Sequence, residues 1–343
     1  MKRYLAFVIL SVLFVSELEA GIILKGAGAT FPFPLYQKWI QIFQKDSDIR
    51  IVYQGVGSSG GIRQLKSKSV DFGGTDAFLS DEDLTQSDAE ILHIPTCIGG
   101  VAIIYHVPGQ HEIRLTPDLV SKIFLGQITA WSDPEIIKVN TGTQLPETQI
   151  SIIHRSEGSG TTFIFTDYLS KVNQEWKNKI GSGKKVIWPK GMGVEGNPGV
   201  AEMVKKVPGS IGYVELTYAV THQLSVAAIR NRAGQYITPS MESVSQAANV
   251  TIPADTRVLL TNTDAPKGYP ISSFTYLIFY KEQNYQERGR EKAEALAKFL
   301  NWAIHEGQSY NESMLYSPLP FKAVTTAEQI IQEMTYNGSP LIH

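Results

Sequence analysis

The sequence predicts an α/β fold with largely parallel sheets and enough chain for two domains of ordinary size. Strand-like and helix-like segments alternate along the 343 residues, which is typical of strand–helix–strand units. Several of the apolar segments are followed by short polar turns rich in glycine, serine and threonine. The sequence contains no recognisable repeat, low-complexity tract or block of like charges that would indicate another class of fold.

The first twenty residues, MKRYLAFVILSVLFVSELEA, have the layout of a secretory signal peptide. Lys2 and Arg3 form a basic start, Leu5–Val15 forms an apolar centre, and Ala20 is a small residue at a cleavage point. The apolar centre is shorter than the roughly 18 residues of a membrane-spanning helix. A buried core helix is the alternative, but the terminal position and the basic start favour a cleaved signal over residues 1–20. We therefore expect export to the periplasm.

Charge and cysteine content narrow the possible functions. The formal net charge is −2 at pH 7, whereas nucleic acids and anionic membranes select for broad basic surfaces. We therefore expect no nucleic-acid partner, and any anion site must be local. Cys97 is the single cysteine of the sequence, so no internal disulfide can form, and we expect a buried thiol. Export without disulfides is typical of a bacterial envelope protein whose size supplies its stability.

The alternation begins with a helix followed by a strand. Pro34 can occupy the first turn of a helix that runs to about Lys45, because proline is tolerated there. The apolar residues of this helix share one face: Leu35, Trp39, Ile42 and Phe43. In the next segment, Ile49–Val56, Ile49, Ile51 and Tyr53 point to one side. This period of two residues predicts a strand.

The same criteria predict the later elements. Strands are expected at Val70–Ala77, Ile98–Val107, Ile150–Arg155, Gly209–Glu215 and Ile271–Tyr280. Helices are expected to begin near Ser58–Gly60 and to span Thr161–Val172 and Arg288–His305. Strand–turn–helix units are therefore expected over most of the chain.

Four polar turns share one design, in which small or hydroxyl residues follow an apolar segment where a helix can begin. They are GAGATFP with Thr30 and Phe31, GVGSSGG with Ser58, GGTDA with Asp76, and HRSEGSGTTF with Arg155, Ser159, Gly160 and Thr161. In open α/β sheets, ligands bind beyond the carboxyl ends of the strands. Helix N-termini there offer free N–H groups, glycines allow close approach, and hydroxyls add donors. Together the turns predict an anion site, although each serine alone is more often a helix cap.

Arg155 and Asp76 indicate which anion would bind. A guanidinium group can bind two oxygens of one oxyanion. A carboxylate beside an anion costs repulsion, unless the ligand carries a proton that the carboxylate can accept. Hydrogen phosphate has such a proton at neutral pH, whereas sulfate has none. Asp76 therefore favours phosphate over sulfate, and arsenate is a mimic that the site would exclude poorly.

Several stretches together give a resemblance to a known family. They are GAGATFPFPLYQKW, YQGVGSSGGIRQ, DFGGTDAFLSDE, RSEGSGTTFIFTDYLSKVNQEW, WPKGMGVEGNPGVA and PGSIGYVE, in this order over most of residues 24–220, with FTYLIFYKEQ beyond them. The chain resembles the periplasmic phosphate-binding proteins of high-affinity phosphate ABC importers.

The resemblance implies the type II periplasmic-binding-protein fold, an α/β arrangement of two lobes with two hinge crossovers and the ligand in the cleft. Lobe I is expected at residues 21–95 and 271–343, and lobe II at residues 96–270. The hinges are expected near Ile94–Gly99 and Tyr269–Ser273, and closure of the lobes would be a hinge motion about them.

The resemblance also implies a ligand set and partners. By motif position, the phosphate ligands would be Thr30, the backbone N–H of Phe31, Ser58, Asp76, Arg155, Ser159, Gly160 and Thr161. Glu157 stands where the family has an aspartate that positions the arginine. The implied partners are inorganic phosphate and the membrane permease subunits of a phosphate ABC transporter, with its ATPase subunits reached indirectly. No cofactor, no metal and no catalysis are implied, and we expect a monomer.

Three alternatives remain. A secreted serine hydrolase or phosphatase is disfavoured, because Glu157-Gly158-Ser159-Gly160 lacks the first glycine of G-x-S-x-G. The seven histidines also show no zinc-ligand spacing such as H-E-x-x-H, and no nucleotide-binding P-loop occurs. The same fold could bind another tetrahedral oxyanion. A secreted phosphate-binding protein could also serve in sensing or adhesion.

Overall fold

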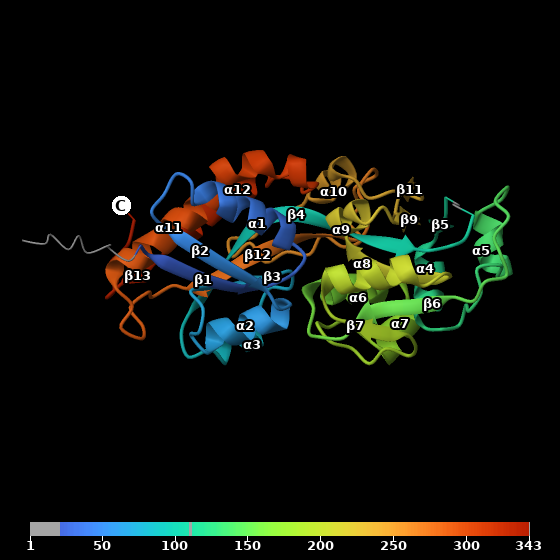
Figure 1. Cartoon of the computed structure of the whole chain (residues 1–343), viewed down its shortest axis with the longest axis horizontal. Helices are drawn as coiled ribbons and strands as arrows, with labels where there is room; N and C mark the ends of the chain where they lie inside the picture. The colour runs from blue at the N-terminus through green and yellow to red at the C-terminus, as the bar shows by residue number, and fades with distance from the viewer. Residues whose placement is uncertain (1–20, 110–111, 343) are drawn as a thin grey trace, which may run out of the picture.

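The computed structural model describes residues 21–109 and 112–342 as an elongated molecule of two lobes (Figure 1). The predicted signal peptide, residues 1–20, lies outside the described residues. A 9-stranded sheet runs through both lobes in the order β2-β1-β3-β12-β4-β8-β6-β7, with β9 paired to β4. Its strands are β1 (Ile23–Gly28), β2 (Arg50–Gly55), β3 (Phe72–Thr75), β4 (Ile91–Tyr105), β6 (Ser151–Arg155), β7 (Met192–Val194), β8 (Ser210–Glu215), β9 (Ser225–Val226) and β12 (Ser272–Tyr280).

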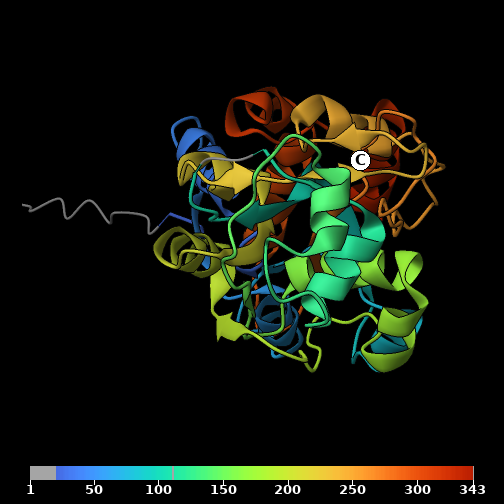
Figure 2. The same ribbon diagram turned by 90° about the vertical axis from the view of Figure 1, so that its right-hand side faces the viewer.

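Helices surround the sheet in both lobes. The first lobe carries α1 (Phe33–Phe43), α2 (Ser58–Lys66), α3 (Asp81–Thr85), α11 (Arg290–Ile304) and α12 (Phe321–Gln332). The second carries α4 (Pro117–Phe124), α5 (Pro134–Val139), α6 (Gly160–Val172), α7 (Gln174–Lys179), α8 (Gly196–Lys206), α9 (Leu216–Thr221) and α10 (Met241–Ala247). In Figure 2 the end of the molecule that carries α5 faces the viewer. None of the helices within the described residues is long and apolar enough to cross a membrane.

Small elements complete the structure. A second sheet contains β5 (Arg114–Leu115), β10 (Ala228–Arg230) and β11 (Tyr236–Ile237), and a hairpin near the C-terminus contains β13 (Thr335–Tyr336) and β14 (Ser339–Pro340). Two 3-10 helices, η1 (Glu306–Tyr310) and η2 (Glu312–Met314), follow α11. Because the chain returns to the first lobe, α11 and α12 lie close to α1 at the same end of the molecule (Figure 1).

Two long strands connect the lobes. The part of β4 from Ile91 to Gly100 pairs antiparallel with β12, and the part from Val101 to Tyr105 pairs antiparallel with β8. Within the lobes, β1 pairs parallel with β2 and β3, and β6 pairs parallel with β7 and β8. The prediction of largely parallel sheets is therefore wrong for the connecting strands, because β12 returns in the direction opposite to that of β4.

The strand β4 also begins earlier than the sequence predicted. It starts at Ile91 instead of Ile98. The sequence did not show this first part, because Pro95 lacks an N–H group and is unusual inside a strand. Thr275 lies opposite Cys97 and Tyr276 lies opposite Pro95, so the ladder contains a bulge at this point. The predicted buried thiol of Cys97 is confirmed.

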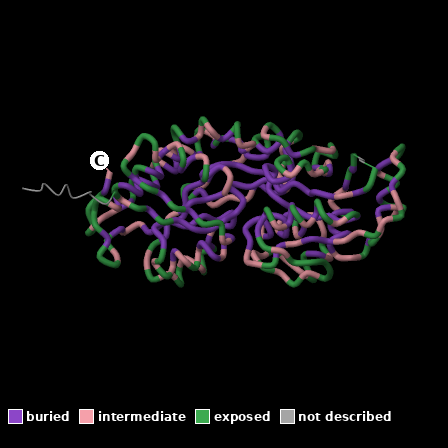
Figure 3. Tube along the Cα trace, in the orientation of Figure 1, coloured by how far each residue is buried: buried purple, intermediate pink, exposed green. Residues whose placement is uncertain are grey.

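The core is rich in aromatic side chains. In the first lobe, the Trp302 ring centroid lies 5.5 Å from that of Phe43 and 6.2 Å from that of Trp39. In the second lobe, the centroids of Phe165 and Tyr213 are 4.6 Å apart. Figure 3 shows that buried residues follow the strands through both lobes, whereas exposed residues lie on the outer helices and loops. The sheet thus forms a continuous support for the turns at its strand ends.

A glycine in α2 allows this helix to approach the sheet closely, and replacing it tests the packing. A Cβ at Gly61 would lie 2.6 Å from both Ala27 O and Gly28 Cα, which are backbone atoms. We therefore expect Gly61→Ala to lower the free energy of unfolding by about 1–3 kcal/mol, measured by urea denaturation.

The matched control is Gly199→Ala in α8, where the nearest atom to the added Cβ lies 3.7 Å away. That change should raise stability by about 0.5–1 kcal/mol, since alanine is the better helix former. Equal stabilisation by both substitutions would contradict the close packing of α2.

Candidate anion-binding site

Three helix N-termini from the two lobes meet at the junction between the lobes. The helix α2 begins at Ser58 in the first lobe, and α6 and α8 begin at Gly160 and Gly196 in the second. The Gly160 N–H donates to Ser58 Oγ over 3.1 Å, and Asn197 Nδ2 donates to Thr161 Oγ1 over 3.2 Å. The first N–H groups of a helix lack intrahelical partners and carry the positive end of its dipole. The junction therefore favours an anion.

The lobes approach each other closely at Gly160. A Cβ at this position would lie 2.4 Å from Ser58 Oγ and 2.5 Å from Asp76 Oδ2. No side chain fits into that space, so a glycine is required for the N-terminus of α6 to reach the first lobe.

The first lobe contributes side chains from the turns after β1 and β3 and from the start of α2. Thr30 Oγ1 accepts hydrogen bonds from Asn197 N at 3.2 Å and from Asn197 Nδ2 at 2.9 Å. Asp76 is 2% exposed, and its Oδ1 accepts a 2.8 Å hydrogen bond from Thr275 Oγ1. Its backbone N–H donates to Ser58 Oγ at 3.2 Å, and the Ser58 hydroxyl lies 3.4 Å from Asp76 Oδ2. The carboxyl group is thus held in one orientation.

The second lobe contributes the only cation of this cluster within the described residues, Arg155, which is 3% exposed. Its Nη1 donates to Thr161 Oγ1 at 3.2 Å. Its Nε donates to Glu157 Oε1 at 2.9 Å, and its Nη2 pairs with the same oxygen. Glu157 Oε1 also accepts a 3.1 Å hydrogen bond from Gly196 N. Glutamate at position 157 therefore reaches the guanidinium and ties it to the start of α8.

The pKa values of the two acids shift in opposite directions, because Arg155 outweighs burial at Glu157 but not at Asp76. Burial raises the pKa of Asp76 to about 7, although Thr275, Arg155 and Ser58 each lower it. Burial alone would also raise the pKa of Glu157, but the hydrogen bonds and charge of Arg155 bring it below the usual value. Glu157 therefore stays ionised as the counter-charge of Arg155, whereas Asp76 can gain or lose a proton near neutral pH.

The structure brings the eight residues predicted from the sequence to this junction: Thr30, Phe31, Ser58, Asp76, Arg155, Ser159, Gly160 and Thr161. Ser159 is the N-cap of α6, and its Oγ accepts a 3.1 Å hydrogen bond from Thr162 N. The cap interpretation of this serine is therefore correct, and its hydroxyl proton is still available to another acceptor. The Phe31 side chain is part of the core, so this residue can serve an anion through its backbone alone.

Two residues of the cluster were missed by sequence reasoning. Asn197 is fully buried and joins the hydroxyls of Thr30 and Thr161. No helix was predicted for the stretch around it, although Pro198 after Gly-Asn is a signal of the first turn of a helix. Thr275 lies within the apolar strand β12, and the sequence contains no signal that its hydroxyl reaches Asp76.

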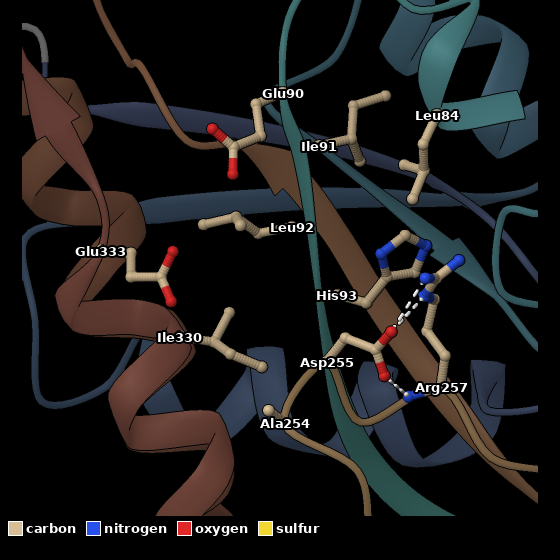
Figure 4. A pocket seen from close by; sticks show the side chains of 10 residues that line it. All are labelled: Leu84, Glu90, Ile91, Leu92, His93, Ala254, Asp255, Arg257, Ile330 and Glu333. Atoms are coloured by element: carbon tan, nitrogen blue, oxygen red, sulfur yellow. Dashed lines mark hydrogen bonds and ion pairs between the residues drawn. The ribbon is translucent and has the colours of Figure 1, made fainter. Parts of the chain in front are cut away.

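A separate cavity of about 370 Å³ lies away from this cluster, between the start of β4, the end of α12 and the segment that contains Asp255 (Figure 4). Its acidic side chains have partners within the protein, because Asp255 binds Arg257, and Glu90 and Glu333 both bind Lys281. It contains none of the converging helix N-termini. Within the part of the chain that the structure describes, no group of three or more His, Cys, Asp or Glu side chains could hold a metal ion.

The fold and the site together define a two-lobed binding protein with an anion site at the lobe junction. The family model of the PBP superfamily domain matches residues 15–306. The chain is 40% identical over 320 residues to the phosphate-binding protein PstS of Xylella fastidiosa (strain 9a5c), which covers 91% of this chain and 86% of that protein. It is 38% identical over 338 residues to PstS of Pasteurella multocida (strain Pm70), covering 97% and 94%. The chain therefore belongs to the PBP superfamily and, within it, to the PstS family of phosphate-binding proteins.

Solved structures share the fold. A phosphate-binding protein from Stenotrophomonas maltophilia has a TM-score of 0.67 at 17% sequence identity, covering 90% of this chain and 93% of that chain. A high affinity periplasmic phosphate-binding protein, PfluDING, has a TM-score of 0.72 at 22% identity over 90% and 93% of the two chains. The type II periplasmic-binding-protein fold, expected from the sequence, is therefore confirmed.

The raised pKa of Asp76 predicts a pH dependence of stability in protein stripped of ligand. The stabilising neutral form is fully present below the ordinary pKa of 3.8 and is lost as the pH rises through about 7. The free energy of unfolding should thus fall by about 4 kcal/mol between pH 4 and pH 8 from this group. In Asp76→Asn this fall in the free energy of unfolding with pH should disappear, which urea denaturation at several pH values would measure. An unchanged slope in the variant would contradict the raised pKa.

Proposed function

We propose that this protein captures inorganic phosphate, as hydrogen phosphate, between its two lobes and delivers it to the permease subunits of an ABC importer. The observation that carries the proposal is the buried Asp76 in a junction rich in donors, whose other carboxylate, Glu157, is already paired with Arg155 on the opposite lobe. Such a carboxyl group suits an anion that brings a proton of its own. The names of the PstS relatives support phosphate as this anion.

The contacts of the junction support roles for Arg155, Asp76 and the two helix N-termini in holding the anion. Arg155 would bind two phosphate oxygens, since Glu157 holds its guanidinium plane in place. The N-termini of α2 and α6 would supply backbone N–H groups and the hydroxyls of Ser58, Ser159 and Thr161. Asp76 would accept the phosphate proton while Thr275 fixes its other oxygen. Sulfate, which has no proton to donate, would be repelled by the ionised form of this carboxyl group.

The division into lobes supports capture by closure. We propose lobe I at residues 21–95 and 271–343, lobe II at residues 96–270, and hinges near Ile94–Gly99 and Tyr269–Ser273. The two hinge segments lie side by side, because Ser273 pairs with Gly99. Closure about this paired hinge would bring the two halves of the site together around the anion.

We further propose that the protein acts in the periplasm, is monomeric and binds phosphate without converting it. Its relatives are binding proteins by name, which supports transport over catalysis. Charge-assisted hydrogen bonds contribute about 1.5–3 kcal/mol each. Several such bonds, less the cost of dehydrating the anion and closing the lobes, leave a binding free energy of roughly −8 kcal/mol, which corresponds to about micromolar affinity.

Calorimetric titration tests the ligand and the role of Asp76 together. Mature protein is unfolded and refolded to remove bound ligand, then titrated with phosphate and with sulfate at neutral pH. Phosphate should bind at micromolar concentrations or below and sulfate should give no heat. Asp76→Asn should reduce the difference in affinity between phosphate and sulfate, because the carboxylate that repels sulfate is removed.

The control for this experiment is Asp255→Asn, which alters an acid of the separate cavity in Figure 4. This variant should keep the wild-type affinity for phosphate and the wild-type preference for phosphate over sulfate. Equal binding of phosphate and sulfate by the wild type would overturn the proton-acceptor role, and absence of binding of either would overturn the proposed function.

Arg155→Ala tests the predicted cation directly. Loss of two charge-assisted hydrogen bonds should weaken phosphate binding by at least about 100-fold in the same titration. Arg257→Ala is the matched control, since Arg257 also binds a carboxylate, Asp255, but lies outside the junction. If both variants bound phosphate equally well, Arg155 would be a structural residue and not a ligand.

A further inference from the structure

Two buried tyrosine hydroxyls bind consecutive carbonyl groups of one turn of the candidate site. Tyr218 Oη donates to Thr30 O at 2.6 Å, and Tyr316 Oη donates to Phe31 O at 2.6 Å. Tyr218 lies on α9 in the second lobe, whereas Tyr316 follows η2 in the first. The turn is therefore held from both lobes, although neither tyrosine was singled out by the sequence.

The bond from Tyr218 fixes the direction of the neighbouring N–H group. The carbonyl of Thr30 and the N–H of Phe31 belong to the same peptide group, which is planar and trans. In such a group the N–H points away from the carbonyl oxygen. A donor on Thr30 O also polarises the group and strengthens the N–H as a donor. Tyr218 thus acts on the backbone N–H predicted as a phosphate ligand.

Asn197 holds the same residue from a second side. Its N and Nδ2 atoms both donate to Thr30 Oγ1, and its Oδ1 accepts a 3.0 Å hydrogen bond from Glu215 N. Asn197 and Tyr218 belong to α8 and α9, which pack on the β8 strand of the second lobe. Thr30, a residue of the first lobe, is therefore bound at its hydroxyl and its carbonyl by the second.

Glu215 completes the arrangement around Tyr316. Its Oε2 lies 3.0 Å from Tyr316 Oη and accepts a 2.8 Å hydrogen bond from Thr217 N. Tyr316 Oη is the donor in both contacts, so its one hydroxyl proton is shared between Phe31 O at 2.6 Å and Glu215 Oε2 at 3.0 Å, with the shorter bond to Phe31 O. Burial raises the pKa of Glu215 to about 8, so this carboxyl is largely neutral at pH 7. Tyr316 is thus oriented without adding a negative charge near the anion.

We propose that Tyr218 and Asn197 are positioning residues that couple lobe closure to ligand retention. When the lobes close, they bind Thr30 and turn the Phe31 N–H toward the anion, while Tyr316 holds the next carbonyl from the first lobe. Opening of the lobes breaks the bonds of Tyr218 and Asn197 to Thr30, so the Phe31 N–H is no longer held toward the anion. This inference rests on the proposed phosphate function.

The test is the kinetics of phosphate binding to Tyr218→Phe, which removes the hydroxyl alone. The dissociation rate constant should rise about 5- to 10-fold, because one hydrogen bond that exists only in the closed state is lost. The association rate constant should stay within about two-fold, because encounter occurs in the open state. Stopped-flow fluorescence of the intrinsic tryptophans follows both rates.

Two tyrosines give matched controls. Tyr280→Phe also removes a buried hydroxyl bound to a backbone carbonyl, Leu65 O at 3.1 Å, but outside the junction. Tyr168→Phe removes a buried hydroxyl that has no hydrogen-bond partner among the described residues. Both should keep the wild-type dissociation rate. Equal dissociation rates in Tyr218→Phe and Tyr280→Phe would overturn the proposal, even if both melt at lower temperature.

A second variant keeps the proposal testable if Tyr218→Phe folds poorly. Asn197→Ser should raise the dissociation rate in the same way, and it should also reduce the rise in melting temperature that phosphate causes relative to the ligand-free protein. If the wild type fails to bind phosphate, the proposed function fails. If the wild type binds phosphate, but Tyr218→Phe and Asn197→Ser release it at the wild-type rate, only the proposed coupling of lobe closure to ligand retention is wrong.

Discussion

The site depends on one electrostatic constraint: a buried arginine and a buried acid must face the same small space without neutralising each other. Arg155 is paired with Glu157, and the hydrogen bonds of Asp76 go to Thr275 and Ser58 instead. If Arg155 paired with Asp76, the positive charge would be satisfied and the anion excluded. The separate partners leave the guanidinium face and the Asp76 oxygen available to one ligand.

Much of the surrounding structure serves this arrangement. The parallel strands bring their carboxyl ends, and hence the N-termini of α2 and α6, to the junction of the lobes. Gly160 permits the approach of α6, and the paired strands β4 and β12 keep the hinge segments together. The tyrosines behind the Thr30–Phe31 turn then set the direction of its peptide groups. Selectivity, closure and retention therefore share a small set of buried hydrogen bonds.

The sequence was informative where one local pattern determines the structure. Strand–turn–helix units around Ser58 and Ser159 were predictable because glycines and hydroxyls after an apolar run have a direct structural meaning. The early start of β4 was hidden by Pro95, and the contact of Thr275 with Asp76 depends on the pairing of β12 with β3. The reach of Tyr218 to Thr30 joins residues 188 positions apart. Such contacts arise from tertiary packing, which no local pattern encodes.

The most direct test of the central claim is a high-resolution crystal structure of the protein with phosphate. The account predicts phosphate at the lobe junction, with one oxygen within hydrogen-bond distance of Asp76 and two others bound by Arg155. Phosphate located elsewhere, or bound at the junction with the Asp76 carboxyl turned away, would contradict the account.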